Sequence, residues 1–228
     1  MDIDIIKGPG NAAASCTLSS GETCTAEGGA MISMSGEMDI QTTTHQRGGG
    51  GGLLKAAKRV LSGESFFLNH FTAGPEGGNL MLSTTLPGDM LAHDLENTGL
   101  VVQSGSFVAC EESVDMDLGW QGMKSMFSGE GLFWIELSGP GQVIVNSFGG
   151  IYPINVNGTE IVDTGHIVAF EESLSFSISK AGASWVSSIL GGEGLVCRFE
   201  GTGTVWAQSH HPVGFGRTLG PMLKSRNN

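Results

Sequence analysis

The clearest pattern of apolar and polar positions is a short segment that occurs twice. Residues 165–176 match residues 105–116, with Gly, Val, Ala, Glu, Glu and Ser identical. After the paired glutamates, apolar residues such as Leu174 and Phe176 alternate with polar ones. A period of two with one apolar face is typical of a half-buried strand. Residues 21–27 form a weaker third match, so the pattern predicts an internal repeat.

Each unit continues with a Gly-Glu dipeptide and two further apolar runs separated by glycines. The glutamates of these dipeptides are 66 and 63 residues apart, which sets the length of the unit. Two apolar runs around a Gly-rich turn predict a hairpin in every unit. The predicted hairpins join residues 66–68 to 80–83, 132–134 to 143–147, and 195–197 to 205–209.

Short helices are predicted before each Gly-Glu dipeptide, because apolar residues recur there at helical spacing. They lie within 53–61, 120–127 and 185–189. One unit alone cannot bury its apolar face, so three units are expected to pack together. We therefore predict an all-β fold: three tandem β repeats with short helices in one pseudo-threefold β-sandwich or barrel. The predicted domain covers residues 1–209, with repeats 1–85, 86–147 and 148–209 and a C-terminal tail at 210–228.

Charge and composition narrow the function. The net charge is −12, whereas a nucleic-acid-binding protein normally carries a basic face, so the charge argues against a nucleic-acid partner. No apolar run approaches the ~18 residues of a membrane helix, so the chain is predicted not to be transmembrane. Asp2 and Asp4 stand where a signal peptide is basic, and residues 8–11 are not apolar, so we predict a cytoplasmic protein.

The four cysteines have neither metal-ligand spacing nor the pattern of a disulfide framework. Cys24, Cys110 and Cys197 fall in positions of the repeat that apolar residues occupy in the other units. A buried free cysteine behaves as a small apolar residue. The cysteines are therefore predicted to be reduced thiols of the core.

The first unit has an insertion with an unusual charge. Five consecutive glycines, residues 48–52, precede the segment 53–61, and four of the eleven Lys and Arg residues lie within 47–61. These four residues are Arg47, Lys55, Lys58 and Arg59. A basic amphipathic helix is suited to an anionic membrane surface or an acidic partner. The alternative interpretation is a capping helix with a solvated charged face.

Candidate ligand-binding residues are few. Glu64, Glu130 and Glu193 of the Gly-Glu dipeptides could converge and bind a cation, or could be turn residues that accept backbone hydrogen bonds. Adjacent glutamates such as Glu111 and Glu112 point to opposite faces of a strand, which argues against a shared proton. The six histidines show no His-x-His, and no phosphate-binding loop or Gly-x-Ser-x-Gly is present. No metal and no cofactor are predicted.

Three motifs carry a resemblance to a known family. They are the repeated strand, helix and Gly-Glu pattern, the glycines before Leu54–Arg59, and the segment Gly63–Asn69. Over residues 1–209 the chain resembles an uncharacterised prokaryotic member of the altered-inheritance-of-mitochondria family. The resemblance implies a tryptophan-RNA-binding-attenuator-like fold and supplies no catalytic residues. The namesake of the fold binds tryptophan and RNA as a ring, but nothing here matches its ligand residues. Eukaryotic relatives are associated with mitochondrial inner-membrane organisation, and a sequence without a transit peptide gives no reason to expect that role here.

The expected function is therefore non-enzymatic binding or scaffolding, with contact to a partner protein or membrane surface through the basic segment 53–61. Two alternatives stay open: a small-ligand sensor with a pocket between repeats, and an enzyme whose site is assembled by loops. Exposed sheet edges in such a domain favour a homo-oligomer.

Overall fold

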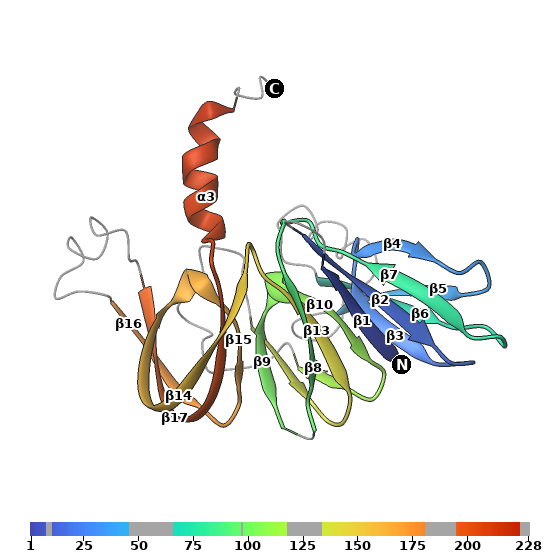
Figure 1. Ribbon diagram of the computed structural model, residues 1–228, viewed down its shortest axis with the longest axis horizontal. Coiled ribbons are helices and arrows are strands. Elements are labelled where there is room, and N and C mark those ends of the chain that lie inside the picture. Colours follow the sequence, from blue (N-terminus) through green and yellow to red (C-terminus); the bar gives the residue numbers. More distant parts are fainter. Residues whose placement is uncertain (8–10, 46–65, 97, 118–133, 181–194, 224–228) are drawn as a thin grey trace.

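The computed structural model describes residues 1–7, 11–45, 66–96, 98–117, 134–180 and 195–223. These residues are mostly β-strand, and every ladder between the named strands is antiparallel. The strands form three sheets that follow one another along the long axis of the molecule (Figure 1). The all-β prediction is confirmed.

The first sheet has the strand order β1-β2-β7-β4. Its strands are β1 (Asp2–Lys7), β2 (Ala12–Leu18), β4 (Met31–Met34) and β7 (Gly78–Leu82). Along β2, buried residues alternate with more exposed ones, as expected for a strand with one face on a core.

The second sheet has the order β5-β6-β3-β10-β13-β8. It consists of β3 (Thr23–Glu27), β5 (Asp39–His45), β6 (Phe66–Thr72), β8 (Met90–Asp94), β10 (Phe107–Glu111) and β13 (Gln142–Asn146). Strands from two separate parts of the chain meet where β3 pairs with β10. β8, β10 and β13 lie in the middle of the molecule, whereas β3, β5 and β6 lie at the same end as the first sheet (Figure 1).

The third sheet has the order β11-β12-β9-β15-β17-β14, and β16 pairs with β17 in addition. Its strands are β9 (Leu100–Gln103), β11 (Asp115–Asp117), β12 (Trp134–Ser138), β14 (Ile151–Asp163), β15 (Ile167–Glu171), β16 (Ser175–Lys180) and β17 (Leu195–Gln208). β14 and β17 pair over thirteen residues, and β17 changes its second partner from β16 to β15 along its length. The result is a strongly curled sheet, a half-barrel at one end of the molecule (Figure 1).

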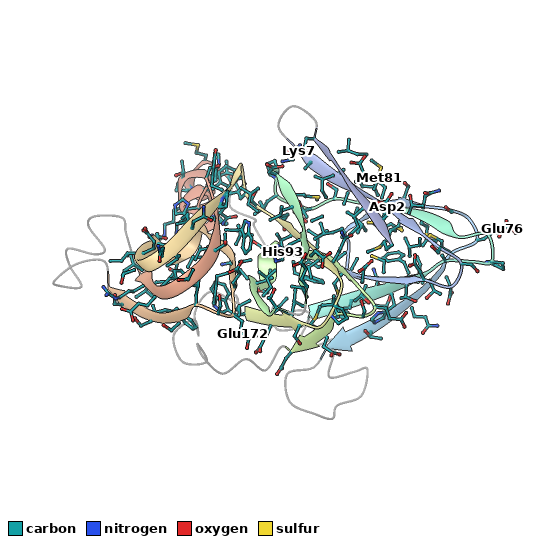
Figure 2. All side chains as sticks on the ribbon, turned by 60° about the horizontal axis from the view of Figure 1, so that its bottom comes forward. Asp2, Lys7, Glu76, Met81, His93 and Glu172 are labelled. Atoms are coloured by element: carbon teal, nitrogen blue, oxygen red, sulfur yellow. The ribbon has the colours of Figure 1, made fainter. Side chains whose placement is uncertain are left out.

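Apolar residues fill the spaces between and within the sheets. One core lies between the first and second sheets and another between the second and third, while a third core fills the curl of the last sheet. β9 and β10 bury residues on both faces, which explains why their sequences read as uninterrupted apolar runs. His93 of β8 lies near the middle of the molecule (Figure 2), with its ring centroid 4.8 Å from that of Trp206 in the third sheet. Burial lowers the pKa of His93.

The three predicted hairpins are wrong. β6 pairs with β3 and β5, whereas β7 pairs with β2 and β4, so the predicted partners lie in different sheets. β12 and β13 are separated in the same way, between the third and second sheets. Gly139 and Gly141 have φ of +95° and +138°, and the connection they form carries the chain into the next sheet without reversing it. In the last unit both runs belong to the single strand β17.

Strand pairing also corrects the position of the weak third match. β10 has a register shift against β13, between residues 107 and 109. β15 has the same shift against β17, between residues 167 and 169. The equivalent shift in the first third of the chain lies in β4, against β7, between Met31 and Ser33. β3 is instead a partner of β10, just as β9 is a partner of β15. By pairing, β4 therefore occupies the place that the sequence match assigns to residues 21–27.

Helices are few among the described residues. Short 3₁₀ turns, η1 (Ser104–Ser106) and η2 (Thr164–His166), lead into β10 and β15. The predicted tail contains helix α3 (Pro212–Leu219) and the 3₁₀ turn η3 (Gly220–Met222), and α3 projects away from the sheets (Figure 1). The predicted helices within 53–61, 120–127 and 185–189 lie outside the described residues.

Candidate functional site

A polar hollow lies over one face of the second sheet, at the end formed by β5, β6 and β3. Gln41, His70, Thr25 and Cys110 are direct partners across four neighbouring strands, so their side chains share this face. The hollow has a volume of 560 Å³ and lies between this face and residues 112–116. Its walls come from the first and second predicted repeats.

His70 is held in the middle of this face by two hydroxyl groups. Its Nδ1 lies 2.8 Å from Thr25 Oγ1, and its Nε2 lies 2.8 Å from Thr43 Oγ1. Thr23 Oγ1 and Thr72 Oγ1, 3.1 Å apart, form the next polar contact along the same strands. Since both ring nitrogens of His70 have partners within the sheet, the ring is positioned and its two hydrogen-bonding sites are occupied.

Two carboxylates complete the hollow on its opposite side. Glu112 and Asp115 line it, and both are exposed. The preceding residue, Glu111, instead accepts a hydrogen bond from the backbone N–H of Gln142 at 2.9 Å. Glu111 is thus bonded to the backbone of β13, while Glu112 lines the hollow. The hollow combines negative charge with hydroxyl groups.

The thiol in the wall of the hollow is not reactive. Cys110 is only 2% exposed, and burial raises the pKa of its thiol to about 12. A thiolate is the nucleophilic form of cysteine, so a thiol with this pKa is inert at neutral pH. All four cysteines are free and buried, which confirms their prediction as reduced core thiols.

A second cluster surrounds the start of α3. His166 and His211 pack edge to face with ring centroids 5.5 Å apart, and His211 Nδ1 accepts the backbone N–H of Gly214 as the helix cap. His166 Nδ1 lies 2.7 Å from the backbone oxygen of Gln208. Phe148 packs against Phe215 of the helix, with centroids 5.2 Å apart. These contacts attach the base of α3 to the third sheet, and sequence analysis did not bring these histidines together.

The residues predicted to bind a partner or cation lie outside the described residues. They are Arg47, Lys55, Lys58, Arg59, Glu64, Glu130 and Glu193. Within the part of the chain that the structure describes, no group of three or more His, Cys, Asp or Glu side chains could hold a metal ion. The same described residues include no helix long and apolar enough to cross a membrane.

The polar hollow is the feature that sequence reasoning missed. The alternation of Thr23 and Thr25 in β3, and of His70 and Thr72 in β6, was visible as a signal for a polar strand face. The pairing of these strands, and their approach to residues 112–116, depends on the sheet topology.

Together, these observations define a mostly β protein with antiparallel sheets and a polar hollow. Residues 4–210 match the model of the family described as "Mitochondrial biogenesis AIM24", and the chain belongs to this family. The predicted family membership is therefore confirmed.

Two relatives illustrate how far the similarity extends. An uncharacterised protein of Streptococcus pyogenes serotype M6 is 30% identical over 205 residues, covering 88% of this chain and 82% of the relative. The chain is also similar to the X-ray crystal structure of a protein from Streptococcus pyogenes, with a TM-score of 0.80 and 28% identity. That similarity covers 97% of this chain and 99% of the other.

Proposed function

We propose that the protein is a non-enzymatic binding protein that holds a small organic cation with hydroxyl or amine groups in the polar hollow. The observation that carries the proposal is the composition of the hollow: two carboxylates face a wall of threonines around a fixed histidine. The proposal develops the alternative of a small-ligand sensor with a pocket between repeats, because residues of the first and second predicted repeats both line the hollow.

The same geometry favours binding over catalysis. Each nitrogen of His70 is 2.8 Å from a threonine hydroxyl of a neighbouring strand, so the ring is held as part of the wall of the hollow. A nucleophilic cysteine needs a lowered pKa, whereas burial raises the pKa of Cys110 to about 12. Hydroxyl groups and carboxylates remain, and they suit recognition of a cationic, hydrogen-bonding ligand.

The test is a binding screen with amines, amino sugars and polyamines, set against neutral sugars of the same size. A ligand stabilises the folded state in proportion to its occupancy, so a rise in melting temperature identifies binders and calorimetry then measures the affinity. Replacing Glu112 by Gln and Asp115 by Asn is expected to weaken cation binding at least ~10-fold, since charge-assisted hydrogen bonds are lost. Glu76→Gln, in an exposed turn at the far end of the molecule (Figure 2), is the matched control. Equal affinity of all three variants, or turnover of a bound compound, would contradict the proposal.

A second candidate function is scaffolding through the basic segment 53–61. It is supported by the concentration of Arg47, Lys55, Lys58 and Arg59 in a chain of net charge −12. A triple change of Lys55, Lys58 and Arg59 to Glu is expected to abolish binding to anionic vesicles or to an acidic partner. Unchanged vesicle and pull-down binding would remove this candidate.

For the fold, we propose that the domain consists of three copies of one unit, related as in attenuator-like proteins. One hydrogen bond supports the repetition, because it occurs at the same place in each third of the chain. Ser35 Oγ, Glu111 Oε2 and Glu171 Oε2 accept the backbone N–H of Asn79, Gln142 and Thr204 respectively. A cytoplasmic location stays a prediction, to be tested by cell fractionation.

A further inference from the structure

Two strand pairings join successive thirds of the chain in the same way. In the first join, Ala109, Cys110 and Glu111 of β10 face Ala26, Thr25 and Cys24 of β3. In the second join, Ala169, Phe170 and Glu171 of β15 face Val102, Val101 and Leu100 of β9. Each time, the strand that carries the register shift pairs with a strand of the preceding third. Each join completes a six-stranded arrangement of the second or third sheet.

The two strands that would make a third join are both at open edges. Within the described residues, β4 pairs only with β7, and the second half of β14 pairs only with β17. Their apolar side chains are exposed: Met31 by 41%, Ile32 by 52% and Ile161 by 60%. β4 and β14 lie at opposite ends of the molecule (Figure 1), so they do not meet within one chain.

We propose that β4 of one copy of the chain pairs antiparallel with the second half of β14, residues 159–163, of another copy. This inference rests on the proposed three-unit arrangement and goes beyond the ligand site. The new sheet would have the order β16-β17-β14-β4-β7-β2, in which the last three strands come from the second copy. This order repeats that of the second and third sheets.

The register of this interface follows from the internal joins. Met34, Cys110 and Phe170 hold the same position relative to their partners Leu80, Val143 and Val205. Gln103 directly precedes the turn η1, and Asp163 directly precedes the turn η2. Val101 and Ile161 lie two residues before Gln103 and Asp163, so they hold equivalent positions. The internal pair Phe170–Val101 therefore predicts the intermolecular pair Met34–Ile161. Ser33–Val162 and Ser35–Glu160 follow as its neighbours.

The backbone groups of both edges are oriented for this pairing. Ser35 donates its N–H to the oxygen of Asn79 in the first sheet at 2.9 Å, so the neighbouring Met34 directs its N–H and C=O outward. Ile161 and Pro153 both occupy odd-numbered positions of β14, so their backbone groups point to the same edge of the strand. Pro153 has no backbone N–H. Proline is tolerated in a strand where the N–H would face away from the sheet, so Pro153 is consistent with an outward direction for both positions.

A second copy is the occupant because the two edges are complementary to each other. β-Strand addition supplies backbone hydrogen bonds along an exposed edge, and the existing joins show that these two strand types accept each other. Since β4 and β14 are different surfaces, the contact is head-to-tail. Such a contact generates a ring when the rotation closes and a filament when it does not.

The experiment measures the mass of the full chain by light scattering over a range of concentrations. Wild type is expected to form concentration-dependent oligomers. Met34→Pro and Ile161→Pro each remove one outward N–H and should each give monomers. In a mixture of the two variants, the intact β14 edge of Met34→Pro can still pair with the intact β4 edge of Ile161→Pro. The mixture should therefore give dimers and nothing larger. Asn155→Pro changes the same edge of β14 outside the join and is expected to associate like wild type.

Several outcomes would overturn the proposal. A wild type that stays monomeric at its solubility limit excludes the interface. Association of Ile161→Pro alone would indicate a symmetric contact through β4, and association of Met34→Pro alone a contact through β14. Circular dichroism melting curves show that each variant is folded, and failure of two folded variants to dimerise on mixing also rejects the join.

Discussion

Glu27 is expected to make the stability of the protein depend on pH. It is the last residue of β3, two positions after Thr25, and its side chain is half-buried on the same side of the strand as the polar hollow. Its strand neighbour Leu68 is only 2% exposed. Burial raises the pKa of Glu27 from 4.5 to about 7, because the charged carboxylate loses solvation.

The sign of the effect follows from which state holds the proton more tightly. Because the pKa of Glu27 is higher in the folded protein, the unfolded chain loses this proton first as the pH rises. The free energy of unfolding therefore falls between pH 4.5 and about pH 7 and is level above that range. A pKa difference of one unit corresponds to about 1.4 kcal/mol, so the full loss is at most about 3 kcal/mol.

Glu27→Gln tests this reasoning, since glutamine has a similar shape and does not titrate. Chemical denaturation at several pH values, followed by tryptophan fluorescence, gives the free energy of unfolding of both proteins. The variant should be close to wild type below pH 4.5 and more stable by up to about 3 kcal/mol above pH 7. Glu76→Gln, in an exposed turn, serves as the control for a loss of charge. A stability difference between Glu27→Gln and wild type that does not change with pH would refute the argument.

Three further predictions concern the free energy of unfolding, and a fourth concerns the reactivity of the cysteines. Phe170→Ala should lower the free energy of unfolding by about 3–5 kcal/mol in a denaturant titration, because Phe170 is 1% exposed and packs against Phe199 with centroids 5.0 Å apart. Gly88→Ala should lower it by about 1–3 kcal/mol, since its Cβ would clash with the backbone oxygen of Ser147. Gly36→Ala, whose Cβ would meet nothing within 4 Å, should change it by less than about 0.5 kcal/mol. The four buried cysteines should react with a thiol reagent only at the rate of unfolding, and rapid modification of the native protein would contradict their burial.

The fold class was predictable because the strongest signals in this sequence come from burial. β10 and β15 are buried on both faces, and β16 alternates around Phe176 and Ile178. Strands of these kinds are recognised from local periodicity alone. Family membership was predictable for the same reason, because its motifs are turn and core patterns.

The hairpins were mispredicted because local sequence does not distinguish a reversal from a change of sheet. Apolar runs on both sides of Gly139 and Gly141 satisfy either geometry. The outcome is decided by distant partners: β12 pairs with β9, and β13 pairs with β10 and β8. The hollow around His70 and the histidines at the base of α3 depend on such distant contacts as well. The sequence signals the polar face of β3 and β6 but not which segments meet there.

The weak third match, which the sequence places at residues 21–27 and strand pairing places at β4, is related to the proposed pairing between copies. β4 has the pairing position of β10, but it lacks the neighbour that β3 provides for β10, so its sequence, Met31-Ile32-Ser33-Met34, carries a weaker core signal. A strand built to remain a solvent edge is typically protected by charge or proline. β4 has neither, whereas β14 has proline in its first half, at Pro153, and none in its second half. β4 therefore lacks both kinds of protection, whereas the second half of β14 lacks proline but carries Glu160 and Asp163. In the proposed arrangement the apolar edge of β4 is covered by β14 of a second copy, and the mixing experiment tests this pairing directly.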